Sequence, residues 1–375
     1  MVNKKQMSEE EIKLHFITPA LEKKWDKKQI RMNVYFTDGR IIVAGKTIKR
    51  GRRNFADYIL EYKPNVPLAV IEAKDNNCSI GDGMQQALEY SEKLDILFTF
   101  SSNGDGFIFH DNTTGKETEI SLNDFPSPKE LWEKYKKHNG ITEKAEDTIT
   151  SDYFYEPGFK QPRYYQRIAV NRTIEEVAKG NKRILLVMAT GTGKTYVAFQ
   201  TIWRLKQAGL AKRVLYLADR NILVDQPKNN DLKPLSKVIT KISKRKADPS
   251  YEVYLSLYQA VSGDEDIKNI YKQFSPDFFD LVIVDECHRG SAKKDTPWRE
   301  ILEYFKSALS NRFFSRYFFP SVPDMYSVAL NFMQISNNAC EDFVLIFNPL
   351  ERKTLVFIPN SFNIHLINSM FKSDK

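Results

Sequence analysis

The sequence predicts an α/β protein built from two domains, and three observations support this fold class. Apolar runs of strand length alternate with amphipathic stretches of helix length as far as about residue 306. The apolar run Ile184 to Met188 is followed by a glycine-rich loop and a helical stretch, Tyr196 to Leu205. The 375 residues are enough for two or three domains, each with its own core.

Composition and charge narrow the class of protein. Hydrophobic residues make up 42% of the chain and charged residues 28%, and the net charge of +8 with a pI of about 9.0 suits a polyanionic partner. The cysteines Cys78, Cys287 and Cys340 match no metal-binding spacing, which favours a reducing cytoplasm. The N-terminus has no signal-peptide core and no apolar run is long enough to span a membrane, so we expect no membrane partner.

The first domain is predicted over residues 1–148. Ser8 and Glu11 form a capping-box pattern, after which Ile12 to Trp25 continues as an amphipathic helix. Asp38-Gly39 predicts a turn, and Lys129 to Lys137 predicts a helix. Strands are expected at residues 30–36, 41–48, 54–62, 67–74, 95–101 and 106–110, with a helix at 82–94.

Asp57, Glu72 and Lys74 are the candidate catalytic residues of this domain. Glu72 and Lys74 are two residues apart at the end of an apolar run, so a strand places them on one face, where buried charge is unfavourable without a function. Asp57 lies on the preceding strand, and two facing carboxylates can bind Mg²⁺. The Lys74 ammonium would then orient the attacking water or stabilise the charge of a phosphodiester transition state. A cross-strand salt bridge is the structural alternative.

The helix after these strands offers two more candidates. Gln86 and Tyr90 are four residues apart, which places them on one helical face, where they could order DNA phosphates or a water molecule at the metal. A partly exposed amphipathic helix would give the same pattern. Glu11 could supply a further carboxylate, but its position is already explained by the capping box.

This set of residues resembles the PD-(D/E)xK nucleases, particularly their RecB-like branch. The matching motif is Asp57, then Glu72-Ala73-Lys74, then Gln86 and Tyr90. Ala56 replaces the proline that often precedes the first aspartate in that family. The resemblance implies a restriction-endonuclease-like fold and Mg²⁺-dependent cleavage of DNA.

The second domain is expected to bind a nucleotide triphosphate. Lys194 would reach the β- and γ-phosphates, and the Thr195 hydroxyl would ligate Mg²⁺. Backbone N–H groups of the loop and the N-terminus of the next helix would surround the phosphates, although Met188 replaces the usual Gly or Ala at the start of the pattern. The expected loop residues are Thr190, Gly191, Thr192, Gly193, Lys194 and Thr195.

A second apolar run, beginning at Phe279, ends in Asp285, Glu286 and His288. Asp285 is expected to hold the Mg²⁺ of bound ATP, and Glu286 to orient or deprotonate the attacking water. His288 is expected to connect the nucleotide site with the rest of the motor. An ordinary turn at a strand end is the alternative for these residues taken alone.

Other segments of this domain resemble superfamily-two helicases. Gln166, which precedes the phosphate loop by about twenty-five residues, matches their adenine-recognition segment and implies selectivity for ATP. Arg220 and Asn221 match a loop that contacts the nucleic-acid backbone. Residues 163–306 are therefore expected to form the first RecA-like lobe, a parallel sheet with the nucleotide at its carboxyl edge, and 149–162 a linker.

The order of nuclease and motor resembles the R subunit of type I restriction–modification enzymes over about residues 8–306. This resemblance implies cleavage of double-stranded DNA coupled to ATP-driven translocation. It also implies methyltransferase (M) and specificity (S) subunits as partners, and S-adenosylmethionine belongs to those partners. The remaining alternatives are a helicase–nuclease of DNA repair and a non-catalytic protein that binds DNA or nucleotide or acts in assembly.

Residues 307–375 match no further family motif. Neither a Ser/Thr-Ala-Thr strand nor a second RecA-like lobe follows residue 306, so we expect a shortened motor that binds ATP but hydrolyses it poorly. The tail is interpreted either as a divergent segment or as the product of a shifted reading frame. Its apolar runs at 343–347 and 355–358 could be strands, which would favour aggregation if unpaired.

Overall fold

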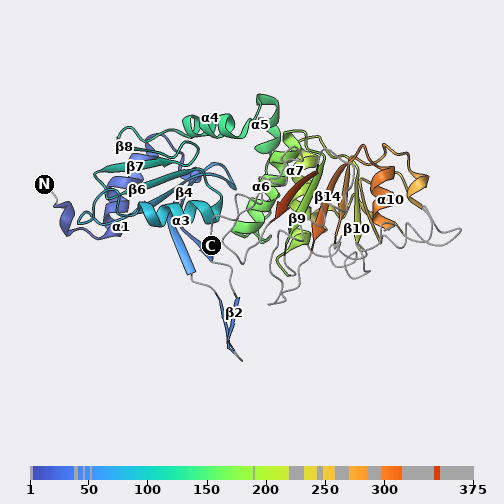
Figure 1. The fold of residues 1–375 in the computed structure, drawn as a ribbon, viewed down its shortest axis with the longest axis horizontal. Coiled ribbons are helices and arrows are strands. Elements are labelled where there is room, and N and C mark those ends of the chain that lie inside the picture. The colour runs from blue at the N-terminus through green and yellow to red at the C-terminus, as the bar shows by residue number, and fades with distance from the viewer. Residues whose placement is uncertain are drawn as a thin grey trace, which may run out of the picture. The chain divides into compact units, whose positions relative to one another are not determined.

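A computed structural model gives the fold of the chain (Figure 1). It divides into two compact units, one consisting mainly of Met1–Tyr153 and Gln161–Ile168, the other mainly of Phe154–Lys160 and Ala169–Asn348. The structure describes residues 3–37, 41–44, 47–50, 53–188, 191–218, 232–242, 248–257, 270–285, 297–314 and 342–346.

The first unit contains a six-stranded mixed sheet in the order β1-β4-β5-β6-β7-β8. Neighbouring strands are antiparallel except β5 and β6, which are parallel and are connected through helix α3. Apolar side chains on both faces bury β5 almost completely, as expected for a central strand. The strands are β1 (Ile30–Thr37), β4 (Arg53–Lys63), β5 (Val66–Ala73), β6 (Phe98–Ser102), β7 (Gly106–Asp111) and β8 (Lys116–Ser121).

Two longer helices pack on this sheet. Helix α3 (Met84–Leu94) lies against β5 and β6 (Figure 1), and its Tyr90 and Leu94 pack in a buried cluster with Phe36 and Val70. Helix α4 (Pro128–Asn139) contacts β4 and β5 and is followed by α5 (Glu143–Ile149). Single-turn 3₁₀ segments occur at η1 (Lys4–Gln6) and η3 (Lys27–Gln29).

Several predicted elements of this unit need correction. The expected helix Ile12 to Trp25 consists of α1 (Glu9–Ile12), a π-helical segment η2 (Lys13–Ile17) and α2 (Thr18–Glu22). The expected strand at 41–48 is a separate antiparallel pair, β2 (Ile41–Ala44) and β3 (Thr47–Arg50). Strand β8 was not predicted because its residues are mostly polar, and α5 lies partly within the predicted linker. The predicted Asp38-Gly39 turn lies outside the described residues.

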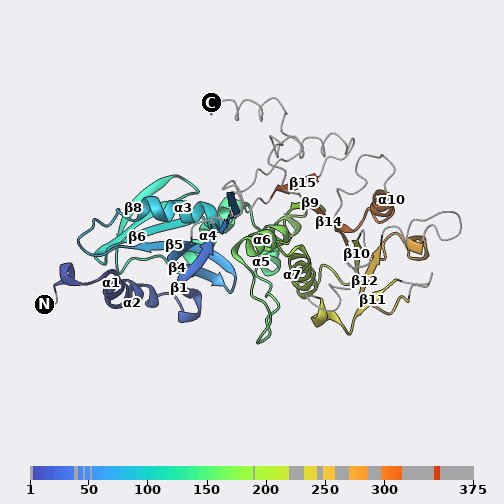
Figure 2. The ribbon, with the colours of Figure 1, turned by 90° about the horizontal axis from the view of Figure 1, so that it is seen from below.

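The second unit contains a seven-stranded sheet in the order β11-β12-β10-β13-β14-β9-β15, and every pairing between neighbours is parallel (Figure 2). The strand after which the glycine-rich loop begins, β9, thus has partners on both sides. The strands are β9 (Arg183–Val187), β10 (Val214–Ala218), β11 (Ile239–Lys241), β12 (Val253–Leu257), β13 (Leu281–Val284), β14 (Leu309–Phe314) and β15 (Asp342–Ile346).

Helix α6 (Tyr164–Ala178), whose first residues are assigned to the first unit, precedes the first strand of this sheet. Helix α7 (Lys194–Gln207) connects β9 with β10, and α10 (Pro297–Tyr304) connects β13 with β14. Turns of 3₁₀ helix occur at η4 (Lys233–Leu235) and η5 (Ile270–Gln273). This alternation produces a RecA-like parallel sheet, as the sequence predicts. No helix among the described residues is both long enough and apolar enough to cross a membrane.

Strand β14 extends the sheet beyond residue 306, where the sequence analysis ended the lobe. It lies between β13 and β9, where the Leu309 N–H donates to the Asp280 carbonyl (2.8 Å) and the Ser310 N–H to the Lys182 carbonyl (2.7 Å). The apolar run predicted at 343–347 forms β15, which pairs with β9. Both strands lie within residues 307–375, for which the sequence predicts no family motif, so part of this segment belongs to the sheet. The run at 355–358 lies outside the described residues.

Ser310→Pro is expected to loosen the sheet around β9. Proline removes the Ser310 N–H and cannot take part in the ladder of an inner strand, so we expect a loss of at least about 1 kcal/mol in the free energy of unfolding. Hydrogen–deuterium exchange of the Arg183–Val187 amides should become faster in this variant. Ser310→Ala retains the N–H and is the matched control. Equal exchange in both variants would contradict the inner position of β14.

Candidate functional site

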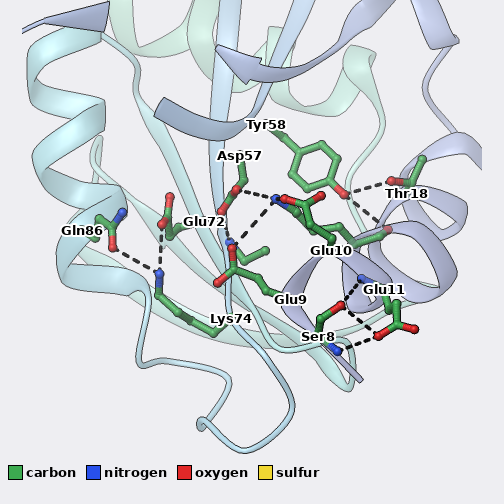
Figure 3. Close-up of polar contacts among 12 residues, drawn as sticks. Ser8, Glu9, Glu10, Glu11, Thr18, Asp57, Tyr58, Glu72, Lys74 and Gln86 are labelled. Carbon is green, nitrogen blue, oxygen red and sulfur yellow. Dashed lines mark hydrogen bonds and ion pairs between the residues drawn. The ribbon is translucent and has the colours of Figure 1, made fainter. Parts of the chain in front are cut away.

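The antiparallel pairing of β4 and β5 brings Asp57 and Glu72 together. Tyr58 is opposite Ile71 in this register, so one further residue along the pair places Asp57 opposite Glu72. Residues directly opposite each other share a face, with Cβ atoms about 5 Å apart. Figure 3 shows both carboxyl groups on the same side of the sheet, beside Lys74.

Both oxygens of the Asp57 carboxylate have protein partners. Oδ2 accepts a hydrogen bond of 2.8 Å from the backbone N–H of Ala73, which fixes the carboxylate to the neighbouring strand. Oδ1 accepts a hydrogen bond of 2.9 Å from the Nζ of Lys13. Asp57 is buried, and these two contacts replace the hydration that burial removes.

Glu72 is held from one side only. Its Oε1 accepts a hydrogen bond of 3.0 Å from Lys74 Nζ, whereas Oε2 is buried and has no hydrogen-bond partner among the described residues. Burial, and then the charge of Asp57, raise the pKa of Glu72 to about 7. A buried carboxylate oxygen without a partner is the kind of atom that a cation would satisfy.

Gly83 allows α3 to approach Glu72 closely. A Cβ atom at this position would lie 3.2 Å from Glu72 Cγ and 2.8 Å from the Ser101 hydroxyl oxygen, so a larger residue would displace one of them. Gly83 is the residue before the first turn of α3, the helix that carries Gln86 and Tyr90. The glycine therefore helps set the distance between that helix and the carboxylates.

Lys74, Gln86 and Tyr90 form a continuous chain of hydrogen bonds. Lys74 Nζ donates to Gln86 Oε1 (3.2 Å), and Gln86 Nε2 donates to the Tyr90 hydroxyl oxygen (2.8 Å). Tyr90 is buried and packs edge-on against Phe36 at 4.9 Å between ring centroids. Tyr90 thus orients Gln86, and Gln86 orients the Lys74 ammonium.

The first helix contributes side chains that the sequence analysis missed. Lys13 Nζ lies 2.5 Å from Glu10 Oε1 and 3.9 Å from Glu9 Oε1, in addition to its contact with Asp57. Burial lowers the pKa of Lys13, but the hydrogen bonds that Lys13 donates to Glu10 and Asp57 outweigh burial and raise it. Burial and the charge of Asp57 raise the pKa of Glu9. The i, i+3 and i, i+4 spacing of these carboxylates to Lys13 was the available sequence signal.

Glu11 does not join this cluster. It forms the predicted capping box, in which its Oε2 accepts from the Ser8 N–H at 2.8 Å and the Ser8 hydroxyl oxygen accepts from the Glu11 N–H at 3.3 Å. The hydrogen bonds that the Ser8 N–H and then the Ser8 hydroxyl donate to the Glu11 carboxylate lower the pKa of Glu11. The side chain of Glu11 therefore stabilises the start of α1.

The donor set of Asp57 and Glu72 fits Mg²⁺ better than a transition metal. In the described part of the chain, no three His, Cys, Asp or Glu side chains gather into a possible metal site. Mg²⁺ is typically held by one or two carboxylates, with waters and substrate phosphates as its other ligands. The partnerless oxygen of Glu72 beside Asp57 meets that requirement.

The second candidate site begins where β9 ends. Gly191 and Gly193 have φ angles of 79° and 86°, in the left-handed region that glycine adopts without strain. Helix α7 begins at Lys194, which is buried, and Thr195 follows it. The first amides of a helix have no partner within the helix, so this turn presents N–H groups suited to an anion. Thr192 is described in the same loop, whereas Thr190 lies outside the described residues.

Asp285 lies directly after β13 and is buried at the carboxyl edge of the same sheet. Its Oδ2 accepts a hydrogen bond of 2.9 Å from the Tyr216 hydroxyl on β10, and its backbone N–H donates to the Leu217 carbonyl at 2.8 Å. Tyr216 was not predicted as a site residue, because as part of an apolar strand it is indistinguishable from core. The expected Glu286 and His288, with Arg220 and Asn221, lie outside the described residues.

Gln166 belongs to the first turns of α6. Its Oε1 accepts a hydrogen bond of 3.0 Å from the backbone N–H of Arg163, and the side chain is buried. Gln166 is part of the first compact unit, whereas Gly191, Lys194 and Asp285 are part of the second. The local hydrogen bond fixes the amide orientation at the start of the helix.

Comparison with known proteins gives matches to restriction enzymes. Residues 159–313 match the family described as the res subunit of type III restriction enzymes. The endonuclease subunit of the type I restriction enzyme EcoAI from Escherichia coli is 52% identical over 313 residues, which cover 82% of this chain and 39% of that protein. The EcoKI endonuclease subunit from Escherichia coli strain K12 is 26% identical, over 64% of this chain and 25% of that protein.

A solved structure has a similar fold. It is a fragment of a protein assigned as the HsdR subunit of a type I restriction enzyme from Vibrio vulnificus YJ016. The two chains are 37% identical with a TM-score of 0.68, over 86% of this chain and 57% of that one. The chain thus spans about two fifths of the EcoAI subunit and about a quarter of the EcoKI subunit.

The raised pKa of Glu72 predicts how the stability of the metal-free protein depends on pH. The folded protein favours the protonated carboxyl, so this contribution to stability is complete below pH 4.5 and is lost as the pH rises to about 7. The loss should reach about 3 kcal/mol, from about 1.4 kcal/mol for each pKa unit. Urea unfolding with a chelator between pH 5 and pH 8 measures it against Glu72→Gln, which cannot ionise. Parallel pH profiles for the two proteins would contradict the prediction.

Proposed function

The chain is a homologue of the endonuclease subunits of type I restriction enzymes, and we propose that it carries their Mg²⁺-dependent DNA nuclease and the first ATP-binding lobe of their motor. The observation that carries the nuclease is the convergence of Asp57, Glu72 and Lys74, with a buried carboxylate oxygen of Glu72 that has no partner in the described part of the chain. In this proposal residues 1–148 form a PD-(D/E)xK domain.

The residues of the proposed nuclease site have three different roles, which are metal binding, charge stabilisation and orientation of Lys74. Asp57 and Glu72 hold Mg²⁺, which when bound supplies Lewis-acid stabilisation of the phosphate and a water of lowered pKa. Lys74 directs its ammonium toward the charge that develops on the phosphate. Gln86 restrains Lys74 through the 3.2 Å hydrogen bond, and Tyr90 restrains Gln86 through the 2.8 Å hydrogen bond. Such restraint matters because preorganised donors lose little orientation during the reaction.

The proposed ATP site combines the loop after β9 with the end of β13. Lys194 and the N–H groups of Gly191, Thr192 and Gly193 bind the phosphates, and the Thr195 hydroxyl and Asp285 hold the accompanying Mg²⁺. The hydrogen bond from the Tyr216 hydroxyl keeps the Asp285 carboxylate in one orientation. By their sequence motifs, Gln166 selects adenine, Thr190 joins the phosphate loop, Glu286 orients water and His288 links the site to the motor.

The proposed partners follow from the homology. The substrate is double-stranded DNA, and the chain works in the cytoplasm with the methyltransferase and specificity subunits of a type I complex. The basic net charge of +8 agrees with a DNA substrate. The chain spans 39% of the EcoAI subunit. For the motor we therefore propose ATP binding by this lobe, and not the DNA translocation of a whole enzyme.

The identity of 52% with the EcoAI subunit favours this function over a helicase–nuclease of DNA repair. Co-purification with methyltransferase and specificity subunits would separate these two functions. A non-catalytic DNA-binding role is separated by the cleavage assay below.

Substitution of the proposed nuclease residues should abolish DNA cleavage. In a supercoiled plasmid assay with Mg²⁺ or Mn²⁺, Asp57→Asn and Lys74→Met are expected to lower the nicking rate by at least about 100-fold, because each removes charge stabilisation at the phosphate. The matched control is Lys63→Met, which changes an exposed lysine at the end of β4. A folded wild-type protein that neither nicks DNA nor binds Mn²⁺ would favour the non-catalytic role instead.

Nucleotide binding should depend on Lys194 and Tyr216. Lys194→Ala is expected to weaken Mg²⁺–ATP binding by at least about tenfold, since it removes a charge-assisted contact worth about 1.5–3 kcal/mol. Tyr216→Phe is expected to weaken binding about threefold to tenfold by releasing the Asp285 carboxylate. Titration with a fluorescent ATP analogue measures both effects, with the exposed Lys212→Ala as control. Unchanged affinity in Lys194→Ala would reject the proposed phosphate site.

A further inference from the structure

Lys13 places a buried positive charge inside the proposed metal site. Its side chain is 2% exposed, and its Nζ lies 2.9 Å from Asp57 Oδ1 and 2.5 Å from Glu10 Oε1. Among these carboxylates, Glu10 is largely exposed, with 69% of its side chain accessible, while only 11% of the Asp57 side chain is accessible. The ammonium of Lys13 therefore extends from the first helical stretch to Asp57, which is much less accessible than Glu10.

Simple stabilisation of the fold does not account for this lysine. A buried ion pair loses the hydration of both charges, and replacement of such pairs by apolar residues of similar size is often neutral or stabilising. Lys13 is also the first residue of the π-helical segment η2, and single π-helical turns within α-helices occur frequently at functional sites. Both features point to a role for the charge at Asp57.

The geometry makes Lys13 a competitor for the ligand that Asp57 offers. Each oxygen of the Asp57 carboxylate accepts one hydrogen bond, Oδ2 from the Ala73 N–H and Oδ1 from Lys13 Nζ, so a cation at either oxygen would bind beside the ammonium. Each carboxylate oxygen has two lone pairs, so a divalent cation at Oδ1 would share this oxygen with the ammonium. Two positive charges a few ångströms apart repel each other strongly in a buried site.

We propose that Lys13 is a positioning residue that serves as an internal counter-ion for Asp57 and thereby lowers the affinity of the nuclease site for divalent cations. This inference rests on the proposed metal-dependent nuclease. Without metal, Lys13 neutralises Asp57 and links the first helical stretch to β4, while Glu10, on the same helical stretch, contacts the ammonium as a second partner. With metal bound, the ammonium turns more fully toward Glu10 and Glu9, which lie within 2.5 Å and 3.9 Å.

Metal binding by the full chain, without DNA or nucleotide, tests this role. Lys13→Met keeps the length and apolar stem of the side chain but removes its charge, and it is expected to bind Mn²⁺ at least about tenfold more tightly than wild type in calorimetric titration. Lys13→Arg retains the charge and is expected to stay within about threefold of wild type. Glu10→Gln withdraws the alternative partner of Lys13, leaves the ammonium on Asp57 and is expected to weaken Mn²⁺ binding.

The outcomes separate this inference from the proposed function. If wild type binds Mn²⁺, Asp57→Asn does not, and Lys13→Met binds no more tightly than wild type, the counter-ion role is wrong while the nuclease site stands. If wild type, Lys13→Met and Asp57→Asn all fail to bind Mn²⁺, the proposed metal site itself is wrong. Circular dichroism and thermal melting confirm folding. Should Lys13→Met not fold, Glu10→Gln carries the test, and unchanged or tighter binding in that variant would overturn the role.

Discussion

The register between β4 and β5 is the constraint on which the proposed nuclease site depends. Tyr58 opposite Ile71 places Asp57 opposite Glu72, and the hydrogen bond from the Ala73 N–H to Asp57 Oδ2 ties the side chain of one strand to the backbone of the other. A shift of this register by one residue would move each side chain of β4 to the opposite face of the sheet, so the Asp57 and Glu72 carboxylates would no longer share a face. The apolar residues that bury both faces of β5 hold the register, so the core of the sheet and the geometry of the site are determined by the same residues.

Features that depend on spacing along the chain could be predicted from the sequence. A spacing of two residues places Glu72 and Lys74 on one face of a strand, and a spacing of four places Gln86 and Tyr90 on one face of a helix. The structure brings these four residues together through hydrogen bonds. The glycine-rich loop followed by α7 was predicted for the same reason. Local periodicity is a strong signal because the backbone geometry of helices and strands fixes where each side chain points.

Features that depend on tertiary contact could not be predicted. Lys13 meets Asp57 across a separation of 44 residues, and the π-helical segment that contains it has no sequence signature. Tyr216 looks like any core residue of a parallel strand until β13 lies beside it. The need for glycine at position 83 follows only from the close approach of Glu72 and Ser101 in the folded chain. Strand β14 was missed because its place in the sheet is set by topology, since its neighbours β13 and β9 are far apart in the sequence.

The inner position of β9 also affects how the protein is made. Its two partners, β14 and β15, are synthesised about 130 and 160 residues after it, which at translation speeds of about 5–20 residues per second is a delay of several seconds or more. During that interval the apolar residues Ile184, Leu185 and Leu186 of the nascent chain have neither strand partner, and such unpaired strands are prone to aggregate. The second unit therefore closes late on the ribosome, and its yield in cells should depend on chaperones that shield this strand until the last partners emerge.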